Sequence, residues 1–356
     1  MKITVNKTVF EQMLSNVNPF IEKKDNSQIT SHVYIEAKEG ILTLKGTDSE
    51  IGLKITTEDV KISEEGQATA NGKKIADYVR NLKDDDINIE YTDNNLTVKQ
   101  KGSKLKMPTF EAKEFPKFPE YEHLPKVNLN SVKLISAFKK VTPAIDTNNP
   151  KYELNGTLLD IKTGGVNIVS TDTKRLAIVK LDEQNKEELS IIIPKKAIQE
   201  IGKLFFDEVD MFYSQNYLVI KTKQYLFFTK LINGKFPDYH RILPKEFKYV
   251  EKLQKDKIVD AIKQISNISN EMKMSFTKDA IVFESLSEEN MEAKTEIEFQ
   301  YSTIESEYQI AFNSKHIIDF LSNIDTKEFS ASFNEANMPF ELKSENFSTI
   351  VMPIFL

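Results

Sequence analysis

Few side chains in this sequence have the types and spacing that catalysis or metal binding requires. Asp84, Asp85 and Asp86 form a run of carboxylates that could hold a divalent cation. This run stands between a predicted helix and a predicted strand, so we interpret it as a solvated turn. Asp172 and Arg175 are three residues apart, and we interpret them as a structural ion pair and not as a catalytic dyad.

The common sequence motifs of enzymes and metalloproteins do not occur. Among eleven glycines only Gly164 and Gly165 are adjacent, so neither a Walker loop nor a G-x-G-x-x-G loop can be written. The chain has no cysteine, which excludes disulfides, thiolate zinc sites, iron–sulfur clusters and cysteine nucleophiles. The histidines are too far apart for a zinc-binding pair: His32, His123, His240 and His316. The sequence predicts a non-catalytic protein without metal or cofactor, and a nuclease built on the aspartate run is a remote alternative.

The elements that must position any functional side chain are repeated three times. One segment occurs at 71–82, 194–205 and 313–324, offsets close to one third of the 356 residues. Each copy has apolar residues at i, i+3 and i+7, a spacing that predicts a helix with one buried stripe. The stripes are Ile75, Tyr78 and Leu82; Ile198, Ile201 and Phe205; and Ile317, Phe320 and Ile324.

Further elements repeat around these helices. Each helix is followed by period-two alternation that predicts an antiparallel hairpin. Each third opens with a short strand, at 3–5, 127–129 and 250–253, and a helix over 10–17, 134–141 and 258–265. The linker 117–126 recurs at 235–245 with one inserted residue. The fold class predicted is α+β: three tandem domains, each with two helices on two small antiparallel sheets, over 1–120, 121–246 and 247–356.

Charge on the predicted helices opposes the average of the chain. The net charge is −6, from 48 Lys+Arg against 54 Asp+Glu, yet basic residues recur at equivalent positions on the faces opposite the buried stripes. Positions seven apart, such as Lys73 and Arg80, share a face. Acids on the same helices, among them Asp77 and Glu200, keep this surface mildly basic. It is either a solvated lysine face or a surface that attracts DNA phosphates loosely and without base reading.

The two ends of the chain carry opposite charge. From 99 to 107 the sequence has four lysines and no acid, whereas from 284 to 298 it has Glu284, Glu288, Glu289, Glu292, Glu296 and Glu298 against only Lys294. This asymmetry suits a head-to-tail contact between two copies of the chain, a contact that closes into a ring when the rotation permits. The alternative is a pair of solvated strand edges that discourage aggregation.

The size of the domains limits what such a ring can enclose. A domain of about 120 residues is roughly 35 Å wide. Three domains in a ring leave a hole of only about 5 Å, whereas six leave a hole of about 35 Å. A DNA duplex is about 20 Å wide. Two chains together are therefore required to surround DNA.

Four segments at the expected spacing resemble one known family. Leu154–Gly156, Thr171–Ala177, Gly234–Tyr239 and Val351–Pro353 resemble the bacterial DNA polymerase III beta subunit, the sliding clamp, and the likeness spans the whole chain. The resemblance implies three clamp-type domains that form half of a closed ring. Two chains joined head to tail would encircle duplex DNA, with helices lining the hole, and would tether the replicative polymerase for processive synthesis without hydrolysing anything.

Three sets of residues are predicted to do this work: basic residues from their recurrence in the sequence, cleft residues from the resemblance, and interface residues from charge together with the resemblance at Leu105 and Ile268. The predicted DNA-facing residues are Lys24, Lys73, Arg80, Lys139, Lys196, Lys203, Lys263 and Lys315. The predicted partner-peptide cleft between domains 2 and 3 contains Leu154, Thr171, Thr173, Leu176, Pro237, Arg241, Ile242, Ile350, Met352, Pro353 and Ile354. The predicted dimer interface contains Lys99, Lys104, Leu105, Lys106, Ile268, Glu292, Glu296 and Glu298. Thr173, where many members have glycine, and the tail Ile354–Leu356 depart from the family pattern, which leaves the preferred partner motif open.

The implied partners follow from this role. They are a second copy of the chain, double-stranded DNA without sequence specificity, the replicative DNA polymerase catalytic subunit, the clamp loader, and other polymerases and repair proteins that carry a short clamp-binding motif. No run approaches the ~20 apolar residues of a membrane span, and the first residues lack a signal peptide, so we expect no membrane contact and a cytoplasmic location. The alternative function is a three-domain scaffold that binds proteins without DNA.

Overall fold

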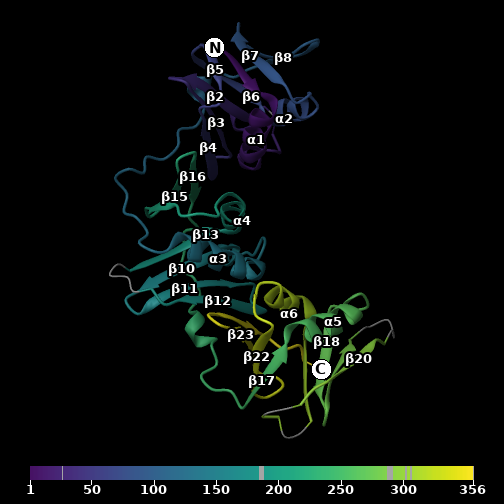
Figure 1. Cartoon of the computed structure of the whole chain (residues 1–356). Coiled ribbons are helices and arrows are strands. Elements are labelled where there is room, and N and C mark those ends of the chain that lie inside the picture. The colour runs from purple at the N-terminus through teal and green to yellow at the C-terminus, as the bar shows by residue number, and fades with distance from the viewer. Residues whose placement is uncertain (26, 184–187, 287–291, 301–302, 305–306, 356) are drawn as a thin grey trace. The chain divides into compact units, whose positions relative to one another are not determined.

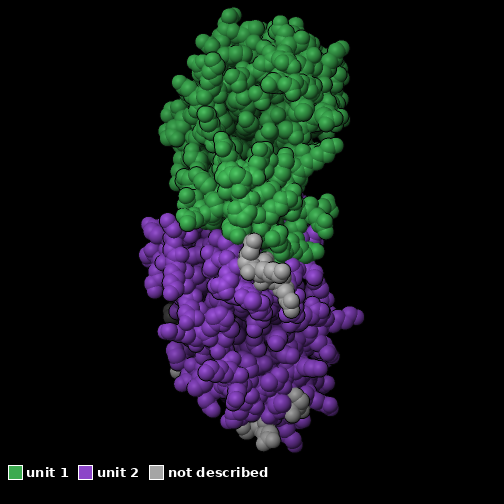
Figure 2. Space-filling view, turned by 90° about the vertical axis from the view of Figure 1, so that its left-hand side faces the viewer, with its two compact units in different colours: residues 1–131, 207–231 green, residues 132–206, 232–356 purple. Residues whose placement is uncertain are grey.

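A computed structural model of the chain describes residues 1–25, 27–183, 188–286, 292–300, 303–304 and 307–355. Glu288 and Glu289 of the predicted acidic segment, and Leu356 of the tail, lie outside the described residues. The chain forms two compact units, coloured separately in Figure 2. Unit 1 contains residues 1–131 and 207–231, and unit 2 contains residues 132–206 and 232–356.

Among its described residues, unit 1 contains two α-helices and two antiparallel sheets (Figure 1). The sheets have the strand orders β5-β1-β7-β8-β9 and β14-β15-β16-β4-β3-β2-β6. The bounds are β1 Lys2–Asn6, α1 Lys7–Val17, β2 His32–Lys38, β3 Ile41–Thr47, β4 Ile51–Thr57, β5 Lys61–Glu64, β6 Gly66–Asn71, α2 Gly72–Arg80, β7 Asp86–Thr92, β8 Asn95–Gln100, β9 Ser103–Pro108, β14 Asp210–Tyr213, β15 Tyr217–Lys221 and β16 Tyr225–Lys230.

Unit 2 contains four helices and two antiparallel sheets among its described residues. The sheets have the strand orders β13-β10-β11-β12-β24-β23-β22-β17 and β20-β19-β18-β21. The bounds are α3 Ser131–Val141, β10 Gly156–Lys162, β11 Gly165–Thr171, β12 Arg175–Leu181, β13 Leu189–Pro194, α4 Lys195–Leu204, β17 Tyr249–Gln254, α5 Lys255–Ser266, β18 Glu271–Phe276, β19 Ala280–Ser285, β20 Lys294–Glu298, β21 Tyr308–Asn313, α6 Ser314–Leu321, β22 Glu328–Phe333, β23 Phe340–Ser344 and β24 Phe347–Val351.

The repeated helices form where the sequence predicts them. Asn71 and Asn313 cap α2 and α6, each through a side-chain oxygen that accepts a backbone N–H of the first turn. The stripes predicted on α4 and α6 are buried. The stripe predicted on α2 is wrong in part, because Tyr78 and Leu82 are only half-buried and Val79 is fully buried instead. The helix ends at Arg80, so Leu82 lies beyond it. The pair that faces the core is Ile75 and Val79, four residues apart.

One predicted strand does not form. Instead of a strand over 127–129, the chain makes an isolated bridge between Lys126 and Phe212 and a hydrogen bond from the Val127 amide to the Met211 carbonyl. Pro125 has no amide hydrogen to donate at the start of this segment, and α3 begins at Ser131. Too few residues remain between Pro125 and the start of α3 for a continuous β-ladder.

The small sheets predicted for each domain join at their edges. Strand β16 pairs with β4, and β12 pairs with β24, both antiparallel. Each junction satisfies backbone groups that an edge strand would leave open. The second junction places residues 175–179 directly beside residues 347–351, which positions the cleft described next.

Candidate peptide-binding cleft

A cavity of about 600 Å³ lies in unit 2 at the junction of β12 and β24. Its floor includes Leu176 and Ile350, which face each other across the two strands. The remaining lining comes from the turn before β12, the linker after residue 240, the loop before β23 and the end of β24: Thr171, Thr173, Arg175, Arg241, Ile242, Leu243, Pro244, Lys245, Glu246, Asn334, Met338, Pro339 and Met352. A cavity of this size can take a few side chains of an extended peptide.

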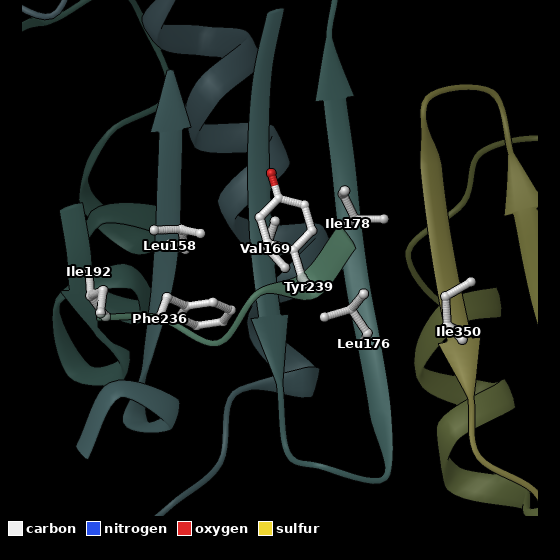
Figure 3. Close-up of a cluster of buried hydrophobic side chains, with 8 residues drawn as sticks. All are labelled: Leu158, Val169, Leu176, Ile178, Ile192, Phe236, Tyr239 and Ile350. Atoms are coloured by element: carbon white, nitrogen blue, oxygen red, sulfur yellow. The ribbon is translucent and has the colours of Figure 1, made fainter. Parts of the chain in front are cut away.

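The linker is fixed to the sheet beside this cavity by an apolar cluster (Figure 3). Phe236 and Tyr239 lie over β10, β11 and β12, and Ile350 from β24 faces Leu176. The other buried members are Leu158, Val169, Ile178 and Ile192. Burial of this much apolar surface holds the linker in place, so one wall of the cavity is already formed without a ligand.

A polar contact orients the linker within this cluster. The Tyr239 hydroxyl donates to Asp160 Oδ2 at 3.0 Å and accepts from Asn167 Nδ2 at 3.0 Å. Asp160 and Asn167 face each other across β10 and β11. Burial, reinforced by the charge of Asp160, raises the pKa of Tyr239. The phenol therefore stays protonated and keeps its donor, which fixes the short 3-10 turn Tyr239–Arg241 at the mouth of the cavity.

The turn before β12 forms the opposite wall. Thr171 Oγ1 donates to the Arg175 carbonyl at 2.6 Å, and Asp172 Oδ1 accepts the Lys174 and Arg175 amides at 3.0 and 2.9 Å. These bonds hold Thr173 at φ 72°, in the left-handed region that favours glycine. A fourth bond runs from the Thr173 amide to Thr171 Oγ1 at 3.1 Å, and the same four-bond turn occurs in unit 1, where Ser49 has φ 74°.

The predicted ion pair of Asp172 and Arg175 is present and belongs to a larger network. Arg175 is 6% exposed and donates Nε to Asp172 Oδ2 at 3.0 Å and NH1 to Asp319 Oδ2 at 2.7 Å, while NH2 donates to the Pro143 carbonyl. Asp319 belongs to α6, so one guanidinium ties three segments together beneath the cavity. Burial first, and the Arg175 charge second, lower the pKa of His316 on the same helix.

Seven of the eleven predicted cleft residues line this cavity: Thr171, Thr173, Leu176, Arg241, Ile242, Ile350 and Met352. Leu154 does not, because it is buried in the 3-10 turn Tyr152–Asn155 that precedes β10. Pro237, Pro353 and Ile354 are also absent from the lining. Sequence reasoning missed Met338 and Pro339, which lie in a loop without periodic pattern, and Pro244, although the repeated linker marks its neighbourhood.

The strained turn leads to a prediction about Thr173. We expect Thr173→Gly to raise the thermal unfolding midpoint of unit 2 by about 2 °C, because relief of left-handed strain at a β-branched residue, about 1–3 kcal/mol, exceeds the backbone entropy cost of glycine, about 0.5–1 kcal/mol. Calorimetry measures this shift. Ser49→Gly is the matched control and should give a smaller gain, since serine is not β-branched. A lower midpoint for Thr173→Gly would contradict the strain argument.

The predicted DNA-facing residues are exposed without exception: Lys24, Lys73, Arg80, Lys139, Lys196, Lys203, Lys263 and Lys315. Seven of them lie on the five helices α2 to α6, and Lys24 follows the turn after α1. Neighbouring acids temper the charge, with Arg80 3.5 Å from Asp77 and Lys203 2.8 Å from Glu200. These positions permit contact with a ligand, as loose phosphate attraction requires.

The oppositely charged segments lie on edge strands. Strand β9 ends the five-stranded sheet of unit 1 and β20 ends the four-stranded sheet of unit 2. Lys104 and Lys106 on β9 are exposed around the half-buried Leu105, and Lys99 pairs with Lys104 from β8. In unit 2, Glu292, Glu296 and Glu298 are exposed in and next to β20, and Ile268 is 39% exposed. Each edge thus offers unpaired backbone groups, one with cationic and one with anionic side chains.

The candidate catalytic residues are ordinary surface groups. Asp84, Asp85 and Asp86 are exposed between α2 and β7, with Asp85 2.7 Å from Lys101. Hydrogen bonds to Lys101 and to the Asp86 amide lower the pKa of Asp85. In the described part of the chain no group of three or more His, Asp or Glu side chains is placed to hold a metal ion.

Models of the DNA polymerase III beta subunit match the chain in three successive parts: the N-terminal domain at residues 1–119, the central domain at 128–238 and the C-terminal domain at 240–355. The chain belongs to the DNA polymerase III beta subunit family. The predicted family and the predicted fold class, three α+β clamp domains in tandem, are therefore confirmed. The chain is a sliding clamp, and clamps of this family carry a peptide-binding cleft.

Individual members of the beta subunit family support this assignment. The beta sliding clamp of Helicobacter pylori strain J99 is 36% identical over 374 residues that cover 100% of both chains. That of Pseudomonas aeruginosa is 26% identical over 371 residues, again covering 100% of both. A crystal structure of the Helicobacter pylori beta clamp bound to a DNA ligase peptide has a TM-score of 0.94 at 37% identity, with 100% of each chain covered. Among the described residues, no helix of this beta subunit is long and apolar enough to cross a membrane.

Proposed function

We propose that two copies of this chain join head to tail into a ring around duplex DNA and hold the replicative DNA polymerase catalytic subunit on it without catalysing a reaction. Each chain supplies three clamp domains, over 1–120, 121–246 and 247–356, and the protein works in the cytoplasm. The observation that carries the proposal is the combination of family membership with a preformed cleft and exposed basic helices.

The chain–chain contact of this proposal uses the two charged edge strands. Strand β9 brings Lys104 and Lys106 with Leu105 between them, and β20 brings Glu296 and Glu298. Antiparallel or parallel addition of one edge to the other would pair backbone groups that are open in the single chain. Lys99, Glu292 and Ile268 complete the interface, in which opposite charges set the head-to-tail register.

The DNA contact is diffuse. The eight exposed basic residues face the duplex and neutralise phosphates without reading bases, because no inserted aromatic or base-contacting motif accompanies them. Weak and exchangeable contacts of this kind leave the ring free to slide. Encirclement, and not affinity, keeps the clamp on DNA.

Partner proteins dock in the cleft of unit 2. A Helicobacter pylori clamp has been crystallised with a DNA ligase peptide, and the cavity lined by Leu176, Ile350 and Met352 suits apolar side chains of such a segment. We propose the eleven predicted residues as the cleft and its immediate support. The replicative polymerase, the clamp loader, and other polymerases and repair proteins with a short clamp-binding motif compete for it.

A charge-swap experiment tests the ring. At about 10 µM, a concentration suited to nanomolar or tighter dimers, the parent chain should elute at twice its mass of 40.9 kDa. Lys104→Glu with Lys106→Glu should give monomers through like-charge repulsion. Adding Glu296→Lys and Glu298→Lys to that chain should restore the dimer. A monomeric parent chain that also fails to stay on DNA would favour the scaffold function instead.

A further inference from the structure

A second cavity, of about 780 Å³, lies in unit 1 on the seven-stranded sheet. Its floor comes from β2, β3, β4, β6 and β16, and its walls from the segment 112–123. The floor residues are Tyr34, Lys45, Lys54, Gln67 and Leu226. This cavity is separate from the cleft in unit 2 and shares no residue with it.

The internal repeat relates this floor to the apolar cluster of unit 2. Tyr34, Lys45 and Lys54 stand 124 positions before Leu158, Val169 and Ile178 on the equivalent strands. In unit 2 those three side chains are buried in one cluster with Phe236 and Tyr239 (Figure 3). In unit 1 the same places hold one tyrosine and two lysines, so the chemistry of the surface changes from apolar to cationic and aromatic.

The covering linker also differs between the two units. Phe118 and Tyr121 are the sequence counterparts of Phe236 and Tyr239. Phe118 packs on Phe228 with ring centroids 4.8 Å apart, and Tyr121 packs on Phe212 at 5.2 Å. Both contacts lie over β14 and β16, toward the other end of the sheet from β2. The linker therefore leaves the two lysines uncovered as the floor of an open cavity.

The two lysines form a like-charge pair that the described residues neutralise only in part. Lys45 and Lys54 face each other directly across β3 and β4 and are both half-buried. The Lys45 ammonium lies 4.5 Å from the centre of the Tyr34 ring. Among the described residues neither lysine has a salt bridge within 4.0 Å, and burial lowers the pKa of Lys45. Opposed like charges on a sheet are destabilising. A carboxylate bound between the two ammonium groups would reduce this repulsion.

The charge of Glu36 offsets part of the effect of burial on the pKa of Lys45, but among the described residues no salt bridge joins the two. The Glu36 carboxylate lies 3.1 Å from the Tyr34 hydroxyl, which also lies 2.7 Å from Gln67 Oε1. Glu120 and Glu122 line the cavity but are exposed. The two lysines on the floor therefore outnumber the one half-buried acid beside them, Glu36, and Glu120 and Glu122 lie at solvent.

We propose that this cavity binds a short acidic segment of a partner protein, with a carboxylate between Lys45 and Lys54 and an adjacent aromatic or aliphatic side chain against Phe115 and Phe118. Aromatic walls with two convergent cations match such a segment in both charge and polarity. A DNA duplex fits less well, because it cannot enter a cavity of this volume and the exposed Glu120 and Glu122 repel phosphate. The site goes beyond the clamp function, which uses the cleft of unit 2.

The test measures fluorescence anisotropy of a labelled probe, Glu-Asp-Tyr-Glu-Leu, against the full-length chain. We expect saturable, salt-sensitive binding, at least tenfold weaker in the double variant Lys45→Met and Lys54→Met. Lys61→Met, an exposed lysine on β5, is the matched control and should bind as the parent does. The neutral probe Gln-Asn-Tyr-Gln-Leu should not bind. Equal binding of the two probes, or no saturation by about 1 mM, would overturn the proposal.

Two further measurements keep the outcome clear. The double variant should melt at or above the parent temperature, because a like-charge pair is removed; if it does not fold, Lys54→Gln alone is used and should still weaken the probe. Met352→Ala, in the cleft of unit 2, should leave probe binding unchanged. Displacement of the probe by a short DNA duplex, or its loss in Met352→Ala, would assign the binding to nucleic acid or to the other cleft and reject the proposal.

Discussion

Replacing Arg175 with methionine is expected to destabilise unit 2 by about 3 kcal/mol and to abolish binding of partner peptides to its cleft. The substitution leaves the carboxylates of Asp172 and Asp319 and the carbonyl of Pro143 without their shared donor. Breaking a buried ion pair from one side costs about 3–5 kcal/mol, and the lower value applies because both carboxylates are about one-fifth exposed. Urea unfolding measures the loss of stability.

The cleft should lose peptide binding because the structure around it is destabilised. The Arg175 carbonyl anchors Thr171, and its guanidinium ties β12 to α6, so the turn that forms one wall loses its support. Arg241→Met provides the matched control, since its side chain is 85% exposed with one partner, Asp238. That variant should change stability by less than about 0.5 kcal/mol while weakening peptide binding. Equal stability losses for the two arginines would refute the network as described.

Reversing the charge of four basic helix residues is expected to reduce loading onto DNA at least tenfold. The variant carries glutamate at Lys73, Arg80, Lys196 and Lys203. Each lost phosphate contact reduces the slope of log binding constant against log salt concentration by about 0.9. Each new carboxylate also repels the duplex. Retention on primed circular DNA, measured at several salt concentrations, gives both quantities.

The control for this variant moves the same charge to other surfaces. Glutamate at Lys61, Lys180, Lys223 and Lys343 replaces four exposed lysines on strands and turns. This second variant should load like the parent chain. Both variants should unfold within about 0.5 kcal/mol of the parent, as expected for exposed substitutions. Similar loading of the two variants would remove the helix residues from the DNA contact.

The repeat made much of the fold predictable from the sequence. Burial imposes a 3.6-residue period on helices and a period of two on strands, so Ile198, Ile201 and Phe205 marked α4 directly. The same signal misled at Tyr78, because Ile75 and Val79, four residues apart, share the buried face of α2 and leave Tyr78 only half-buried beside them. It also predicted a strand at 127–129, where apolar residues alternate but few backbone partners are available.

The joining of sheets was not predictable, and the cleft depends on it. Whether Leu176 of β12 meets Ile350 of β24 depends on two edges 174 positions apart, and no local pattern records such a pairing. Met338 and Pro339 line the cavity from a loop, where burial follows no period. One signal was present and unused: Thr47–Ile51 and Thr171–Arg175 share the Thr-Asp start of the same turn, which marks Ser49 and Thr173 for a left-handed backbone.

Encirclement, and not affinity, should hold this protein on DNA. One measurement tests this directly. The parent chain is placed by its clamp loader on a closed circular plasmid at moderate salt, and the circle is then cut once with a restriction enzyme. We expect retention on the closed circle and release from the linear product, because a ring can slide off a free end. Equal retention on closed and linear DNA would contradict encirclement.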